Sequence, residues 1–162
     1  MTGGTRGIGR AIAARLAEEG CRVGVCGRDR EALRETAEDL RGLSTEAIGM
    51  EVDVLRAGEV ERFVASCADA FGGVELLVAN VGGASGGSLL GSTREDWERT
   101  LGLNVLHAVD AVRAAVPYMR RGGGSVLLVA PISGSKPAPK AQYGAAKCWL
   151  PEHFAMLAGT LY

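Results

Sequence analysis

Apolar and polar residues follow two alternating patterns along this chain: short apolar runs, and longer segments with apolar residues at helical spacing. The short runs predict buried strands over residues 22–27, 46–54, 74–79 and 125–130. The helical spacing predicts helices over residues 10–19, 29–40 and 59–71, from about 93 onward and from about 141 onward. Strands that alternate with helices in this way predict a parallel sheet covered by helices.

Polar residues and glycines mark several of the expected helix ends. Asp29 can cap the helix that follows it, Gly20 ends the first helix, and residues 122–124 end the long one. In the helix over 59–71 we expect four inward residues: Val60, Phe63, Val64 and Cys67. On the long helix the predicted apolar stripe consists of Trp97, Leu101, Val105, Val109, Val112 and Val116.

Composition narrows the class of protein. A chain of 162 residues with 47% hydrophobic residues predicts one globular domain over 1–162. A net charge of −1, from 18 basic and 19 acidic side chains, argues against nucleic acid and anionic membranes as partners. No stretch approaches the roughly 20 apolar residues of a membrane span, and no charged leader with an apolar segment begins the chain.

Metal binding is not expected from the cysteines and histidines. The four cysteines have neither C-x-x-C pairing nor metal spacing, which favours free thiols in a reducing compartment and a cytoplasmic protein; they are Cys21, Cys26, Cys67 and Cys148. His107 and His153 lack partnering ligands, so we expect surface or helix residues without a role.

Three glycines, Gly3, Gly7 and Gly9, directly precede the first helical pattern. Glycine allows a tight turn and leaves no Cβ between the backbone and a phosphate, while a helix N-terminus favours a bound anion. The arrangement predicts a dinucleotide pyrophosphate site. Because glycine makes up 24 of the 162 residues, this cluster alone is weak evidence.

Five features, in the right order over nearly the whole chain, resemble the short-chain dehydrogenase/reductase family. They are the loop from Thr2-Gly3 to Gly7-Ile8-Gly9, Asp53-Val54, Asn80-Val81-Gly82, Asn104, and the pair Tyr143 and Lys147. The resemblance implies a Rossmann-type doubly wound parallel sheet. It also implies that a nicotinamide cofactor contacts Gly3, Thr5, Arg6, Gly7, Ile8, Gly9, Arg28, Asp53, Val54, Asn80, Gly82, Tyr143 and Lys147.

The implied reaction is hydride transfer between NADP(H) and a ketone or secondary alcohol, with Tyr143, Lys147 and Asn104 as a proton relay. Residues four apart on a helix share a face, so Tyr143 and Lys147 can both point at one bound nicotinamide. A phenol has a reference pKa near 10, and lowering it by about three units takes roughly 4 kcal/mol of preferential phenolate stabilisation. A nearby ammonium and a positive nicotinamide can supply that stabilisation.

The residues after the second strand favour NADP(H), with NAD(H) as the alternative. Gly27 stands where NAD-preferring relatives tend to have a carboxylate, and Arg28 and Arg6 are cations suited to a 2′-phosphate. Asp29 can approach a 2′-hydroxyl, although helix capping is its plainer role.

The chain departs from the family pattern in its chemistry. The family serine that binds the substrate carbonyl falls on Ala130 or Pro131, and Ser133 is a candidate substitute. Losing that donor predicts a loss of about 2.7–4 kcal/mol in transition-state stabilisation. Pro151, four residues after Lys147, predicts a kink that costs roughly 3 kcal/mol.

It also departs at both ends, so we expect an incomplete Rossmann-type domain. The family's first strand is reduced to Met1, and its last strands and substrate loop are absent after Tyr162. One hypothesis is that Met1 is a misassigned start. We expect marginal stability, or oligomers formed through the long helices. The alternative function is an impaired pseudoenzyme or truncated remnant that binds cofactor or pairs with a relative without turnover; an unrelated α/β binding domain is a third interpretation.

Overall fold

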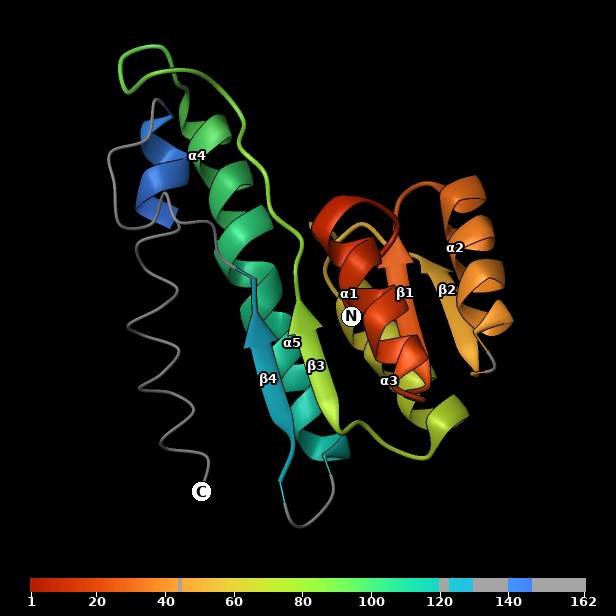
Figure 1. Ribbon diagram of the computed structural model, residues 1–162. Helices are drawn as coiled ribbons and strands as arrows, with labels where there is room; N and C mark the ends of the chain where they lie inside the picture. Colours follow the sequence, from red (N-terminus) through yellow and green to blue (C-terminus); the bar gives the residue numbers. More distant parts are fainter. Residues whose placement is uncertain (44, 120–122, 130–139, 147–162) are drawn as a thin grey trace.

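A computed structural model describes residues 1–43, 45–119, 123–129 and 140–146 (Figure 1). In chain order the elements are α1 (Gly7–Glu18), β1 (Val23–Gly27), α2 (Arg30–Gly42), β2 (Ala47–Glu51), α3 (Glu59–Phe71), β3 (Leu76–Ala79), α4 (Arg94–Leu101), the π-helical segment η1 (Gly102–Leu106), α5 (His107–Ala115), the 3-10 turn η2 (Val116–Tyr118) and β4 (Ser125–Leu128). Residues 141–146 are also helical. This confirms the predicted order of strands and helices.

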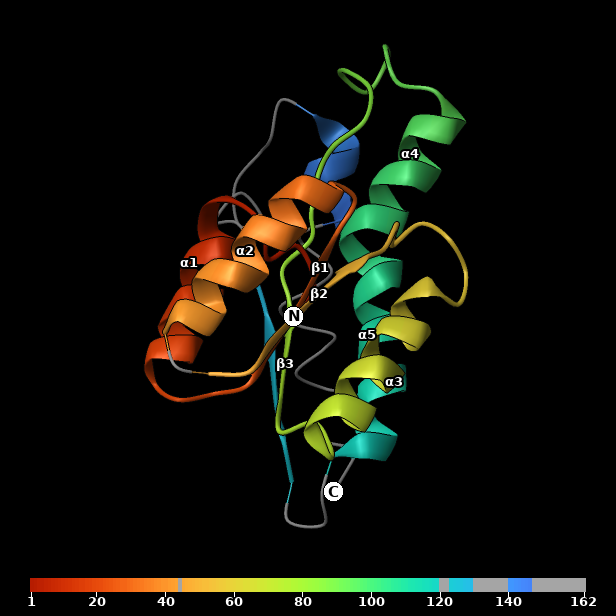
Figure 2. The same cartoon turned by 90° about the vertical axis from the view of Figure 1, so that its right-hand side faces the viewer.

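The strands pair in parallel as two couples, β1 with β2 and β3 with β4. Among the described residues, Thr2 bridges the two couples, because it forms parallel bridges with Cys26 of β1 and Ala79 of β3. Helices α1 and α2 lie on one face of the strands, and α3, α4 and α5 lie on the other (Figure 2). The arrangement is the predicted doubly wound sheet, with a gap between β1 and β3.

Local capping fixes where two of the helices begin. The Asp29 carboxylate accepts from the amides of Glu31 and Ala32, which confirms it as the cap of α2. Thr93 and Asp96 form a reciprocal capping box at the start of α4.

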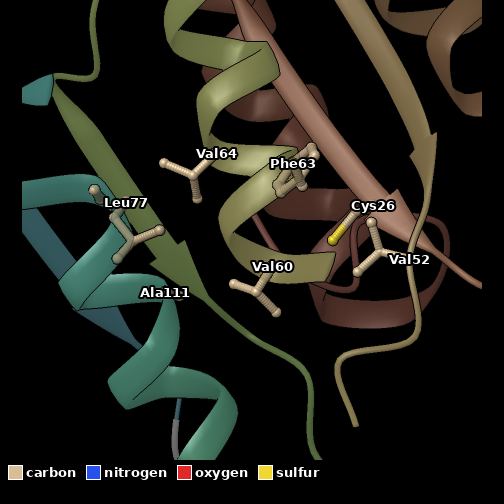
Figure 3. Packing of buried hydrophobic residues seen from close by; sticks show 8 residues of the cluster. Cys26, Val52, Val60, Phe63, Val64, Leu77 and Ala111 are labelled. Atoms are coloured by element: carbon tan, nitrogen blue, oxygen red, sulfur yellow. The ribbon is translucent and has the colours of Figure 1, made fainter. Parts of the chain in front are cut away.

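The main core lies between β1, β3, α3 and α5 (Figure 3). Its buried members are Cys26, Val52, Val60, Phe63, Val64, Leu77, Ala111 and Ala115. The inward prediction for α3 is confirmed at Val60, Phe63 and Val64, whereas Cys67 is only partly buried.

The predicted stripe on the long helix is confirmed at Val105, whereas its other members are only partly buried or exposed. The buried positions there are Thr100, Gly102, Asn104, Val105, His107, Ala108, Ala111 and Ala115. Leu101 is instead exposed, and Val109 and Val112 are only partly buried. Small alanines let α5 pack against α3 and β3, whereas the predicted stripe consists of the larger apolar residues beside these alanines. His107, expected at the surface or in a helix, begins α5 and is buried.

The predicted strand over 125–130 is confirmed as a strand by β4, but its predicted burial is wrong. β4 ends at Leu128, and Ser125, Val126 and Leu127 are exposed. Within the described residues β4 pairs only with β3, so its other edge has no strand beside it. Residue 130 lies outside the described part.

A cavity of about 330 Å³ occupies the gap between β1 and β3, and its walls include residues of both strands and of α3. The chain enters this gap at Met1, whose amino group donates to the Gly24 carbonyl at 2.6 Å. This is the position that the family resemblance assigns to its first strand, so the prediction of an incomplete sheet is confirmed there.

Candidate cofactor and catalytic site

The turn over residues 3–9 carries the chain from the gap in the sheet into α1. Gly3 and Gly7 have φ of +69° and +53°, values that residues other than glycine rarely adopt. A Cβ at Gly9 would lie inside van der Waals distance of the Gly3 carbonyl oxygen and the Asn80 amide. Glycine at these positions therefore lets the first turn of α1 pack directly on the loop.

The N-terminus of α1 is open to a ligand. Arg6 caps it without a side-chain hydrogen bond, and both Arg6 and Gly7 are exposed. Ile8 is 67% exposed, which is unusual for a large apolar side chain. Amides of a first helical turn lack helical acceptors and attract anions, so these residues fit a pyrophosphate group.

Asn80 ties the end of β3 to this turn. Its side-chain amide donates to the Gly3 carbonyl at 2.8 Å, and its backbone amide donates to the Thr2 hydroxyl at 3.1 Å. The same hydroxyl accepts from the Val81 amide at 3.3 Å. The predicted residues of the glycine loop and of the Asn80–Gly82 segment are therefore brought together, although the role seen for Asn80 is a tether of the loop.

Arg28 follows β1 on the same side of the sheet. The preceding Gly27 lies against the loop, because a Cβ there would be 3.4 Å from the Thr5 side chain. Arg28 and Arg6 are exposed and form no ion pair with any described residue. Both guanidinium groups are therefore available to an anionic ligand.

Asp53 and Val54 follow the carboxyl end of β2. The Val52 amide donates to the Gly27 carbonyl at 2.8 Å, which aligns the ends of β1 and β2. The Asp53 carboxylate accepts from the Leu55 amide at 3.1 Å, so it shapes its own turn. The structure thus gathers the glycine turn, Arg28, Asp53 with Val54, and the Asn80–Gly82 segment at the carboxyl ends of β1, β2 and β3, where open α/β sheets bind ligands.

Asn104 is fully buried within the π-helical segment η1. Its Oδ1 accepts from the Gly83 amide at 3.2 Å, and its Nδ2 donates to the Gly83 carbonyl and to the Thr100 carbonyl, both at 2.6 Å. The side chain clamps the loop after Asn80 against the long helix. Short π segments are frequent at functional sites.

Tyr143 is half-buried in the helix over 141–146. The neighbouring Gln142 is fully buried, and its Nε2 donates to the Ser85 carbonyl. The helix that carries the tyrosine is therefore tied to the same loop that Asn104 clamps.

Part of the predicted catalytic set lies outside the described residues. This applies to the predicted catalytic Lys147 and Ser133, and to the departures at Ala130, Pro131 and Pro151. Cys148 also lies outside the described part, in which Cys21, Cys26 and Cys67 are free thiols. No cluster of ligands that could hold a metal occurs among the residues that the structure covers.

The family model for short chain dehydrogenases matches residues 1–159. The chain belongs to the short-chain dehydrogenase/reductase family. Among curated proteins, it is 38% identical to dehydrogenase/reductase SDR family member 4 of Sus scrofa over 141 residues, which is 86% of this chain and 50% of that protein. The chain spans 50–59% of the length of the first curated relatives that it matches.

Solved structures of this family confirm the Rossmann-type fold. A short-chain dehydrogenase from Burkholderia cenocepacia in complex with NADP matches with a TM-score of 0.93 and 32% identity, over 99% of this chain and 66% of that one. An NAD⁺-bound xylitol dehydrogenase matches with a TM-score of 0.92 and 29% identity, over 99% of this chain and 63% of that one. The partial coverage of the longer chains agrees with an incomplete fold, and the family match overturns the unrelated α/β domain.

Nothing in the comparisons with the short-chain dehydrogenase/reductase family supports the alternative of a remnant without turnover. Members of this family are oxidoreductases, and the matched structures carry NADP or NAD. The described residues include no helix with the length and apolar character of a bilayer span.

Sequence reasoning missed Ser85, Thr100 and Gln142. Each makes a polar contact with a partner 15 or 57 positions away, and no short-range pattern marks such a pair. A weak signal exists at Gln142, an amide beside the candidate tyrosine at the start of an otherwise alanine-rich helix.

Proposed function

We propose that this protein is an NADP(H)-dependent oxidoreductase that transfers hydride between the cofactor and a ketone or secondary alcohol. The observation that carries the proposal is the glycine turn, in which Gly9 packs on Gly3 and Asn80 and leads into the open N-terminus of α1. A close backbone approach and a helix N-terminus are what a dinucleotide pyrophosphate requires.

The proton chemistry belongs to Tyr143, Lys147 and Asn104. When bound, the nicotinamide cofactor supplies or accepts the hydride. Tyr143 exchanges its phenolic proton with the substrate oxygen, and Lys147 stabilises the phenolate and binds the ribose. The clamp between Asn104 and Gly83 supports a role for Asn104 in holding this side of the site in place.

Two observations support NADP(H) over NAD(H). Arg6 and Arg28 are exposed cations on the side of the sheet that holds the glycine turn. The Asp29 carboxylate is occupied by two amides of α2, which favours its capping role over a ribose contact. Fluorescence titration with NADPH and NADH should give a dissociation constant about tenfold lower for NADPH, and tighter NADH binding would refute the assignment.

Turnover with a panel of aliphatic, cyclic and aromatic ketones tests the reaction. Oxidation of NADPH, followed at 340 nm, should depend on the ketone and fall by at least about 100-fold in Tyr143→Phe, because general acid–base groups contribute factors of about 10²–10⁴. The variant should still bind NADPH. Equal turnover in wild type and Tyr143→Phe, or NADPH binding without turnover on any ketone, would contradict the proposed reaction.

The remaining proposals concern partners and location. We propose a homo-oligomer formed through the long helices, because Leu106 is 56% exposed and Leu101 is also exposed on that element. Light scattering of Leu106→Glu against wild type tests this, with a smaller species expected for the variant. The free thiols of the described residues support a cytoplasmic location.

A further inference from the structure

Packing alone does not account for Gln142. The side chain is fully buried, and its Oε1 has no hydrogen-bond partner among the described residues. A buried polar atom without a partner costs about 1–3 kcal/mol, and an apolar side chain of the same length would avoid that cost. Among the described residues, the amide donates from Nε2 to the carbonyl of Ser85.

Ser85 joins its own loop to two helices. Its amide donates to the Thr100 hydroxyl at 3.1 Å, its hydroxyl donates to Asp96 at 2.7 Å, and its carbonyl accepts from Gln142. Both α4 contacts and the contact to the helix over 141–146 therefore converge on one residue. Two positions earlier, Gly83 is held by both polar groups of the Asn104 side chain.

The α4 side of this junction is firmly anchored. Asp96 accepts from the backbone amide and the hydroxyl of Thr93, each at 3.0 Å, as part of the capping box. The bond from the Thr93 amide, followed by the Ser85 hydroxyl, lowers the pKa of the Asp96 carboxyl. An ionised carboxylate fixed in this way is a strong acceptor for Ser85.

Successive residues on a helix point about 100° apart. A bond that fixes Gln142 against Ser85 therefore also fixes the direction in which Tyr143 leaves the same turn. Because the Ser85 loop is clamped to Asn104, the bond relates the tyrosine to the asparagine.

We propose that Gln142 is a positioning residue that, through Ser85, sets the orientation of Tyr143 relative to Asn104. This inference rests on the proposed function of those two residues. It assigns Gln142 no contact with substrate or cofactor. Misplacement of a reacting group by about 1 Å can lower the rate about 100-fold, so such a link can govern turnover.

The test replaces Gln142 with Met, which has a similar length and no amide. The matched control is Ala145→Ser, an exposed position on the same helix. Hydrogen exchange at the Gly83 and Ser85 amides should become about tenfold faster in Gln142→Met and stay unchanged in the control. The melting temperature should change by less than about 3 °C, because removing the unpartnered Oε1 offsets the lost bond.

Kinetics separates positioning from a purely structural role. For Gln142→Met, kcat in NADPH oxidation with the best ketone of the panel should fall at least about tenfold, with the dissociation constant for NADPH unchanged. Gln142→Glu should recover turnover as the pH falls, because a protonated carboxyl can again donate to the Ser85 carbonyl. Wild type should show no such rise in turnover as the pH falls.

Three results would overturn the inference. The first is wild-type exchange at Gly83 and Ser85 in Gln142→Met, and the second is wild-type kcat in that variant. The third is faster exchange throughout the sheet together with a lower melting temperature, which would make Gln142 a general structural residue. Failure of the proposed function gives a different signature: wild type lacks ketone-dependent turnover, and the exchange measurement still decides whether Gln142 holds the loop.

Discussion

A strand fused ahead of Met1 should fill the gap between β1 and β3 and stabilise the fold. The first residues already make strand-type bonds with both neighbours. Thr2 donates to Val78 at 2.9 Å, Gly3 donates to Cys26 at 3.0 Å, and Cys26 donates to the Met1 carbonyl at 3.3 Å. A segment placed ahead of Met1 would therefore continue in the direction of β1 and β3 and run through the cavity of about 330 Å³ between them.

The size of the effect follows from burial. We consider a five-residue extension, Val-Ala-Leu-Val-Ile, joined directly to Met1. Burying its four larger side chains on both faces at roughly 2.3 kcal/mol each, with a smaller share from Ala, is worth about 10 kcal/mol, and ordering five residues at about 1.5 kcal/mol each costs about 7.5 kcal/mol. The net gain of about 2.5 kcal/mol corresponds to a rise in melting temperature of roughly 5–10 °C for a chain of this size.

Thermal unfolding followed by circular dichroism at 222 nm measures the gain. The matched control is Gly-Ser-Gly-Ser-Gly at the same place, which also converts the amino group of Met1 into a peptide amide but buries almost no apolar surface. The apolar extension should melt well above the control. Equal melting temperatures for the two extensions, within about 2 °C, would refute the assignment of this gap as the position of a central strand.

Three further predictions follow from the same region and from the glycine turn. Burial lowers the pKa of the Met1 amino group below its ordinary value of 8.0, so below pH 8 the unfolded chain binds more protons than the folded chain. The free energy of unfolding should therefore rise as the pH rises toward 8. In urea titrations, N-terminal acetylation should remove this pH dependence. Burial raises the pKa of the Cys67 thiol from 9.0 to about 11, so stability should fall as the pH rises above 9, and less steeply in Cys67→Ala. Gly9→Ala should weaken NADPH binding by at least about tenfold, because the new Cβ would collide with the Gly3 carbonyl. The control is Gly42→Ala, where a Cβ meets nothing within 4 Å, and it should leave the dissociation constant for NADPH unchanged.

Local chemistry accounts for what could be predicted without coordinates. Asp29 caps α2 through amides two and three residues away, and the glycines of the turn meet a backbone requirement at their own positions. The alternation of apolar runs and helical segments likewise predicts a parallel sheet, because each segment must bury its own apolar face. Interactions over a few residues are encoded next to each other in the chain, so their patterns can be read directly.

Only the tertiary structure decided which face of the long helix is buried. Ala108, Ala111 and Ala115 are buried on α5, which packs against α3 and β3, whereas the larger Val109 and Val112 are only partly buried. The exposure of β4 is likewise decided by tertiary structure, because it depends on which strands lie beside β4 among the described residues.

The link between Gln142 and Ser85 spans 57 positions, so no periodicity or motif indicates it. By itself the sequence determined the order of the elements, the cap of α2 and the glycine turn. The buried face of the long helix and the contacts around Ser85 exist only because folding brings distant segments together, and a one-dimensional pattern carries no distance between them.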